Sequence, residues 1–255
     1  MPISVIKAIA ATLTLWAASV SADTPLSLAT LNMPPLEYQE NGVVKGISTD
    51  IVNTVFARMG ISTDTQLYPF ARAIKMVEQQ KVDAIFSIVS TPKRQIQLSF
   101  SDESLIDDVT SLFVRHDADI EFNGDLSSLT HYRFGALRAA HYGNRWQQAL
   151  RSGAIEKVEM VSDQRQNILK LAHNRIDIII GPRLSILHEL NILGLQQQIK
   201  ILPVPVEVVP TYLAFAKDRV PQAIRLQFTE QLRQLKQEEL YQQIISSYIK
   251  TTPAH

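Results

Sequence analysis

The chain has 255 residues, of which 45% are hydrophobic, and its 25 Lys and Arg balance its 25 Asp and Glu to a formal net charge of zero. This composition suits one large or two modest folded domains and excludes a disordered chain, which would combine low hydrophobicity with high net charge. It gives no sign of a nucleic-acid partner, which draws a basic surface. The absence of cysteine excludes disulfides, thiolate metal sites and a cysteine nucleophile.

The first 22 residues differ from the rest of the chain. Lys7 precedes an apolar run over residues 8–18, and Val20-Ser21-Ala22 shows the small-x-small pattern that signal peptidase recognises. The run is shorter than the roughly 20 apolar residues of a membrane-spanning helix. We therefore expect a signal peptide over residues 1–22, cleavage after Ala22, and a soluble protein in the periplasm.

From residue 26 onward, segments typical of strands and helices alternate. In the first half we expect strands over residues 26–30, 65–68, 82–88 and 109–114, and helices over 47–59 and 70–80. In the second half we expect strands over 133–137, 157–161 and 176–180, each followed by a helix, and then two helices over 221–250. Strands interleaved with helices predict an α/β fold with largely parallel sheets.

One short pattern occurs once in each half of the chain. Gln80-Lys81-Val82-Asp83-Ala84-Ile85 follows a helix and opens a strand, and Asn174-Arg175-Ile176-Asp177-Ile178-Ile179 does the same. Two similar helix-to-strand turns would explain this pattern, and so would two lobes of similar build. We favour the two-lobe interpretation and keep the other open.

Several further motifs follow one another in a characteristic order. They are Pro34-Pro35 after the first strand, Gly46-Ile47 before Asp50-Ile51-Val52, Lys81-Val82-Asp83-Ala84, Thr91-Pro92-Lys93-Arg94, Phe100-Ser101-Asp102 and Arg175-Ile176-Asp177. No single motif is specific, but their order and spacing extend over nearly all of the chain after residue 22. In this respect the chain resembles the family 3 solute-binding proteins, the amino-acid-type receptors of bacterial ABC importers.

The resemblance implies a periplasmic-binding-protein-like fold with two α/β lobes. Each lobe would be a mostly parallel sheet flanked by helices, and two crossing strands would join the lobes. We expect lobe 1 to comprise residues 23–114 and 212–255 and lobe 2 to be inserted over residues 117–206, with hinges near 112–116 and 207–212. In such proteins the lobes close around a bound ligand.

Arg94 is the first candidate for ligand binding. Thr91 can cap a short helix with Pro92 at its first position, and the matching arginine of the family grips the ligand's carboxylate. A guanidinium suits this task because its planar fork donates two parallel hydrogen bonds. By position in the resemblance, the other candidate ligand-binding residues are Ser87, Phe70, Tyr38, Arg72, Arg138 and His141.

The chain departs from the family pattern at three places. Val89 stands where a Ser or Thr is usual, Arg138-Ala139-Ala140-His141 replaces a Gly-Ser/Thr-Thr loop, and Pro182 replaces the Asp that pairs with the ligand's ammonium. If Arg138, His141 and Arg183 face the cleft, the wall of lobe 2 is basic. We therefore expect an anionic ligand, or a diverged amino acid whose ammonium pairs with Glu37 or Asp102 instead.

An enzymatic function has no positive support in the sequence. There is no Gly-x-Ser-x-Gly elbow, phosphate loop, dinucleotide fingerprint or pair of histidines at metal-ligand spacing, so we expect no enzyme, no cofactor and no metal. A dehydratase of the same fold, using Glu37 or Glu103, is a minor alternative. The expected function is the binding of a small polar, carboxylate-bearing ligand, an amino acid or a related organic anion, for uptake by an inner-membrane ABC permease. The alternative is a sensor that signals to a membrane partner, and we expect a monomer in either case.

Overall fold

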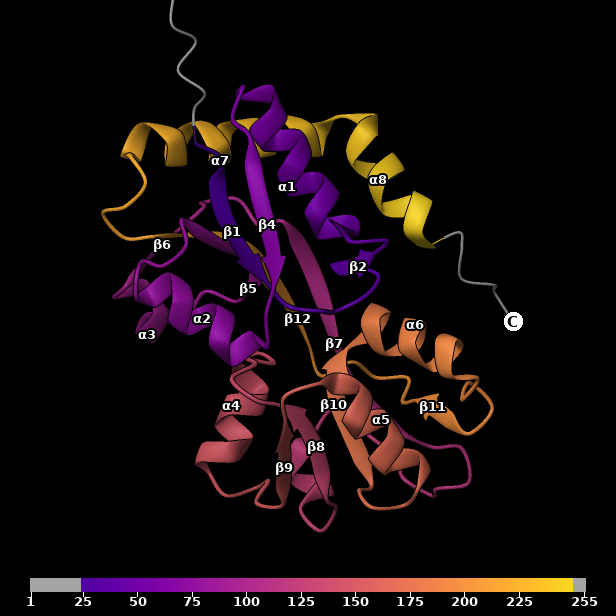
Figure 1. Cartoon of the computed structure of the whole chain (residues 1–255). Helices are drawn as coiled ribbons and strands as arrows, with labels where there is room; N and C mark the ends of the chain where they lie inside the picture. Colours follow the sequence, from indigo (N-terminus) through magenta and orange to yellow (C-terminus); the bar gives the residue numbers. More distant parts are fainter. Residues whose placement is uncertain (1–23, 250–255) are drawn as a thin grey trace, which may run out of the picture.

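The computed structural model describes residues 24–249, so the expected signal peptide over residues 1–22 lies outside the described residues. Within this range the chain is mixed α/β and is divided into two halves that meet at the middle of the molecule (Figure 1). The expected α/β class with a periplasmic-binding-protein-like fold is confirmed. No helix in residues 24–249 is long and apolar enough to cross a membrane.

The first half contains a sheet whose parallel core is formed by three strands. β1 (Leu26–Thr30) lies between β4 (Thr63–Leu67) and β5 (Ala84–Ile88). The remaining elements of this half are the short strands and the helices that surround this core: β2 (Tyr38–Glu40), β3 (Val43–Lys45), α1 (Ile47–Arg58), α2 (Phe70–Glu78), α3 (Pro92–Gln95) and β6 (Leu98–Phe100).

The second half repeats this plan with β10 (Ile178–Pro182), β8 (Phe134–Leu137) and β9 (Val158–Val161) as consecutive parallel neighbours. Its other elements are the 3-10 turn Leu126–Leu129, α4 (Asn144–Arg151), α5 (Gln164–Ala172), α6 (Arg183–Leu193) and β11 (Ile199–Ile201). Two further helices, α7 (Gln222–Gln237) and α8 (Glu239–Ile249), end the described chain.

Two long strands pass from one half to the other. β7 (Ile106–Arg115) and β12 (Glu207–Ala216) pair antiparallel, with Ile106 opposite Thr211 and Thr110 opposite Glu207. Beyond this shared segment β12 pairs with β5 and β6 of the first half, and β7 pairs with β10 and β11 of the second. Residues 112–115, where we expected the first crossing, therefore lie in the sheet of the second half.

The short pattern found twice in the sequence has the same structural role in both halves. Asp83 accepts hydrogen bonds from the backbone N–H and the hydroxyl of Ser27, at 2.8 and 2.6 Å. Asp177 accepts from the backbone N–H and the guanidinium of Arg133, each at 2.8 Å. Each aspartate thus ties the beginning of its own strand to the beginning of the parallel neighbour. The pattern thus marks the same helix-to-strand junction in each half, as both interpretations of it predict.

The C-terminal helices pack against the N-terminal half (Figure 1). Phe228 of α7 is fully buried, and its ring centroid lies 4.9 Å from that of Phe56 in α1 and 5.8 Å from that of Phe215 in β12. The hydrophobic core of the first half is therefore assembled from both ends of the chain, whereas the second half buries Trp146 against Phe134 in a core of its own.

Substituting Phe228→Ala should lower the free energy of unfolding by about 3–5 kcal/mol, because a large buried ring leaves a cavity. Urea unfolding followed by circular dichroism measures this change. Leu226→Ala is the matched control on the same helix: Leu226 is 55% exposed, and its truncation should change stability by less than about 0.5 kcal/mol. Equal effects of the two substitutions would contradict the packing of α7 on the first half.

Candidate functional site

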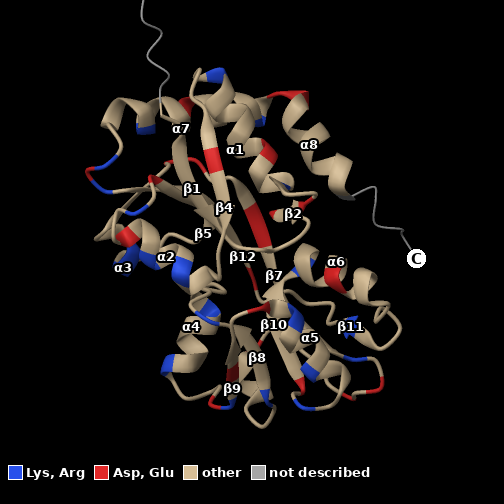
Figure 2. Cartoon of the chain, viewed as in Figure 1, with Lys and Arg blue, Asp and Glu red and all other residues tan. Residues whose placement is uncertain are grey.

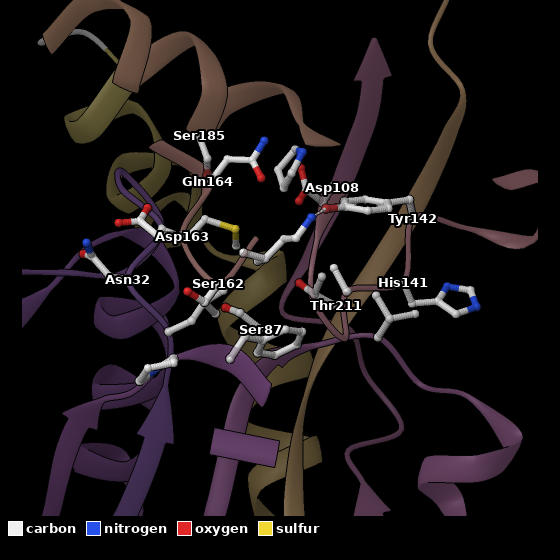
Figure 3. Close-up of a pocket in the computed structure, with 18 of the residues that line it drawn as sticks. Asn32, Ser87, Asp108, His141, Tyr142, Ser162, Asp163, Gln164, Ser185 and Thr211 are labelled. Atoms are coloured by element: carbon white, nitrogen blue, oxygen red, sulfur yellow. Dashed lines mark hydrogen bonds between the residues drawn. The ribbon is translucent and has the colours of Figure 1, made fainter. Parts of the chain in front are cut away.

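A cavity of about 460 Å³ lies between the two halves, beside the crossing strands. Its wall includes residues at the carboxyl ends of strands from both halves. Ser87 lies near the end of β5, Leu137 is the last residue of β8 and Pro182 is the last residue of β10. Asp108 and Thr211 reach it from β7 and β12 (Figure 3). Open α/β sheets bind ligands at the carboxyl ends of their strands, and cavities of roughly 300–1,000 Å³ hold small molecules.

Arg94 occupies the first-half wall of this cavity. Thr91 accepts a hydrogen bond from the Arg94 backbone N–H at 3.3 Å and caps α3, which fixes the start of the arginine side chain. Only 8% of Arg94 is exposed, and its guanidinium lies 5.7 Å from the centre of the Phe70 ring. Burial lowers the pKa of Arg94 to about 10, so it keeps its charge at neutral pH.

The Arg94 guanidinium connects the two halves. Nη1 donates to the carbonyl of Val89 at 2.7 Å, within the first half, and Nη2 donates to the carbonyl of Ala139 at 2.8 Å, in the second. Ala139 has φ of 65° and Ser87 has φ of 59°, a left-handed conformation that residues with a side chain adopt at a cost. Both residues stand at the site, where such conformations are common.

Glu37 lies behind Ser87 and is completely buried. The Ser87 hydroxyl donates to one carboxylate oxygen of Glu37 at 2.8 Å, and the other oxygen, Oε1, has no hydrogen-bond partner within the described chain. Burial raises the pKa of Glu37 to about 8, although the hydrogen bond from Ser87 opposes part of this rise. At neutral pH, Glu37 is therefore mostly a neutral acid that holds Ser87 in place.

Asp108 lines the cavity and is 8% exposed. Burial raises its pKa to about 7, and the backbone N–H of Val109 opposes this rise. Figure 2 shows acidic residues on β7 where this strand passes between the halves, and Figure 3 shows the Asp108 carboxylate near the Tyr142 hydroxyl. Tyr142 accepts a hydrogen bond from the Leu137 N–H at 2.7 Å.

The cavity brings together four of the seven residues expected from the sequence, namely Arg94, Ser87, Phe70 and His141. The His141 ring points away from the other labelled side chains, and its Nδ1 accepts from the Gly143 N–H at 3.2 Å (Figure 3). Burial and the charge of Arg94 lower the pKa of His141, so this imidazole is neutral at neutral pH.

The other three residues lie outside the cavity wall, as far as the described chain defines it. Tyr38 contacts Tyr248 edge to face at 6.4 Å between centroids. Arg72 lies 5.3 Å from the centre of the Tyr68 ring, and it is Tyr68 that faces the cavity. Arg138 extends toward the carbonyl of Met160, 3.5 Å away.

The basic wall expected for the second half does not form among the residues that line the cavity. Arg183 turns toward Ser111, to whose hydroxyl it donates at 3.2 Å, and leaves Pro182 at the wall. The charged lining residues are instead Arg94, Asp108 and Asp163, while the lining is otherwise largely apolar, with Leu31, Met33, Phe70, Val89 and Val209 among its members. Asp102, named as a possible counter-charge, is exposed and lies outside this lining.

Sequence reasoning missed Asp108 and Tyr142. A signal for Asp108 was present: the strand Ile106-Asp107-Asp108-Val109 carries two adjacent carboxylates, and successive side chains of a strand point to opposite faces. One of the two therefore had to face the core. No comparable signal singled out Tyr142, which reaches the cavity from the loop before α4.

The model of the bacterial extracellular solute-binding proteins, family 3, matches residues 26–251. The chain belongs to this family. A curated relative, the probable amino-acid-binding protein YxeM of Bacillus subtilis, is 22% identical over 218 residues, which are 84% of this chain and 79% of YxeM. The resemblance identified from the motifs is thus confirmed.

Solved structures share the family 3 fold with this chain. An ancestral arginine-binding protein bound to arginine superposes with a TM-score of 0.76 at 18% identity, over 88% of this chain and 97% of that one. A histidine kinase sensor domain with similarity to periplasmic binding proteins gives a TM-score of 0.77 at 15% identity, over 88% and 95% of the two chains. The family, YxeM and the ancestral arginine-binding protein are binding proteins by their names. Among residues 24–249 no group of three metal-ligating side chains is found.

Stability should fall as the pH rises from about 5 to about 8. The pKa of Glu37 is higher in the folded chain than in the unfolded chain, so the folded chain keeps a proton at pH values where the unfolded chain has lost it. The contribution of this proton to the free energy of unfolding is lost as the pH rises through about 8. Glu37→Gln replaces the carboxyl group with an amide that does not titrate. The difference between the unfolding free energies at pH 5 and pH 8 should shrink by about 2 kcal/mol or more, since each pKa unit corresponds to about 1.4 kcal/mol.

Urea unfolding at the two pH values measures this difference. The exposed Glu121 provides the control variant, Glu121→Gln, which should keep the wild-type pH dependence. The same pH profile in wild type and Glu37→Gln would show that Glu37 ionises in the folded chain as it does in water.

Proposed function

We propose that this chain binds a small carboxylate-bearing ligand, an amino acid or a related organic anion, in the cavity between its two halves, for uptake by an ABC-type importer in the inner membrane. The observation that carries this proposal is the Arg94 guanidinium, buried in the cavity wall with both terminal nitrogens aimed at carbonyls rather than at a carboxylate. Among residues 24–249 Arg94 has the electrostatic influence of Glu78 but no ion pair with a carboxylate, and a buried arginine of this kind favours an anion supplied by a ligand.

The ligand's carboxylate would replace the carbonyl of Ala139 as the acceptor for Nη2 of Arg94. This exchange is favourable because a hydrogen bond between two charged groups is roughly twice as strong as one between neutral groups. Ser87 would lie beside the carboxylate with its backbone, since its hydroxyl donates to Glu37, and the ring of Phe70 would stay in contact with the guanidinium. His141 would contact the ligand from the second half.

Closure of two lobes around the ligand is part of the proposal. The crossing would lie at residues 106–110 and 207–211, where β7 and β12 pair, which moves the first hinge to the N-terminal side of the expected residues 112–116. Lobe 1 would then comprise the chain before residue 106 and after 211, and lobe 2 the residues between 110 and 207. Hinge motion of this kind closes periplasmic binding proteins.

A sensor function uses the same binding step and differs in its partner. The likeness to a histidine kinase sensor domain concerns the fold alone, at 15% identity. Uptake of the identified ligand by cells that lack this chain distinguishes the two functions: loss of uptake supports transport, and unchanged uptake with a lost transcriptional response supports sensing.

Thermal unfolding of the chain from Asp23 onward, in the presence of L-amino acids and dicarboxylates, tests the binding proposal. A ligand that binds only the folded state stabilises it by about 2.7 kcal/mol at a hundredfold excess over Kd, which raises Tm by several degrees. Arg94→Gln should lose this rise. The exposed Arg175 gives the control Arg175→Gln, which should keep it.

Circular dichroism at 20 °C verifies that both variants are folded before ligand is added. A rise in Tm with a carboxylate ligand that is as large in Arg94→Gln as in wild type would refute the assignment of the ligand's carboxylate to Arg94.

A further inference from the structure

We propose that Asp108, on the crossing strand β7, holds a cationic group of the ligand, so that the cavity selects ligands carrying both a carboxylate and an ammonium or guanidinium group. This inference deepens the proposed function and rests on it. In the second lobe, Pro182 lines the cavity in place of the Asp expected to pair with the ligand's ammonium. The inference assigns this role to the strand that joins the two halves.

Asp108 is buried to more than nine-tenths and reaches the cavity wall, yet no side chain of residues 24–249 forms an ion pair or hydrogen bond with its carboxylate. A buried carboxylate is unfavourable unless a cation or several hydrogen-bond donors compensate it. The backbone N–H of Val109 provides one such donor. A ligand cation would supply the missing charge.

The other carboxylates near the cavity are already engaged or lie behind its wall. Asp163 is exposed and caps α5 by accepting from the Arg165 N–H at 2.9 Å. Glu37 is separated from the cavity by Ser87, which donates to it. Asp108 is thus the buried carboxylate that a ligand can touch.

The cavity wall holds one basic and one acidic side chain that form no ion pair with each other in the described chain. Arg94 enters from α3 and bonds to backbone carbonyls, Asp108 enters from β7, and no ion pair joins them in the described chain. A ligand with two like charges would leave one of these groups uncompensated. A ligand with one negative and one positive group compensates both, and the largely apolar remainder of the wall suits an aliphatic body between or beyond them.

Burial disfavours the charged form of Asp108. Glu37 and the Tyr142 hydroxyl interact with it electrostatically, and His141, Asp163 and Arg94 share the cavity wall. Burial raises the pKa of Asp108 to about 7, so a cation that binds beside it at neutral pH should drive off its remaining proton. Ligand binding is therefore expected to release protons.

Isothermal titration with two matched pairs of probes tests the inference. L-leucine and 4-methylpentanoate differ in the α-ammonium, and L-arginine and L-citrulline differ in the side-chain cation. In at least one pair the cationic member should bind wild type about tenfold or more tightly, as expected for a buried charged contact. Asp108→Asn should abolish that preference while binding of the other member changes little.

Asp107→Asn is the matched control, because Asp107 is the neighbouring residue on the same strand and is exposed. It should keep the wild-type preference. Titration at pH 7 in two buffers of different ionisation enthalpy should show proton release for wild type and Asp107→Asn, and none for Asp108→Asn. Without ligand at pH 8, Asp108→Asn should melt at or above the wild-type Tm, since the unpaired charge is gone.

The outcomes separate the two proposals. Binding of the carboxylates through Arg94 without preference for the cationic probe, or a preference that survives in Asp108→Asn, overturns the assignment of Asp108 and leaves the proposed function standing. If none of the four probes binds wild type, both the amino-acid assignment and this inference fail.

Discussion

The antiparallel pairing of β7 with β12 is the constraint on which the rest of the structure depends. The pairing over residues 106–110 and 207–211 joins two halves that otherwise have separate hydrophobic cores. Beyond the shared segment β7 continues into the sheet of the second half and β12 into that of the first, so a side chain on the shared segment lies between the halves. Asp108 and Thr211 reach the cavity for this reason. The segment that joins the two halves is thus also part of the wall of the proposed binding site.

Three buried ionisable residues at or next to this cavity lack full compensation among residues 24–249. Arg94 bonds only to carbonyls, Glu37 leaves one oxygen unbonded, and Asp108 lacks a cation. Each of these groups lowers the stability of the protein without ligand, because burial takes away the water that would solvate the group and no protein side chain takes the place of that water. Away from the cavity, Asp83 and Asp177 each pair with an arginine, although some other buried atoms, such as Glu189 Oε2, also have no partner in the described chain. This contrast is typical of a site that a ligand completes.

The two halves are similar in plan but unequal in what they contribute to the site. The first half supplies the charged group with the better-defined position, because the cap at Thr91 and the ring of Phe70 fix Arg94. The second half contributes carbonyl, amide and aromatic groups, with Ala139 and Pro182 in places where the family uses other residues. The specificity of this chain within family 3 should therefore differ from that of members with the usual second-lobe pattern.

The sequence by itself determined the α/β class, the family and the position of Arg94 in the site. The α/β class follows from apolar periodicity, whereas the family and the place of Arg94 follow from the ordered motifs that the chain shares with family 3, Thr91-Pro92-Lys93-Arg94 among them. It also placed Ser87, Phe70 and His141 at the cavity. Tertiary structure alone decided the sign of the charges in the cavity wall, because the direction of a loop side chain depends on contacts from distant segments. Arg138 and Arg183 turn to Met160 and Ser111, whereas Asp108 turns inward because the pleat of β7 and its register with β12 leave it no other face.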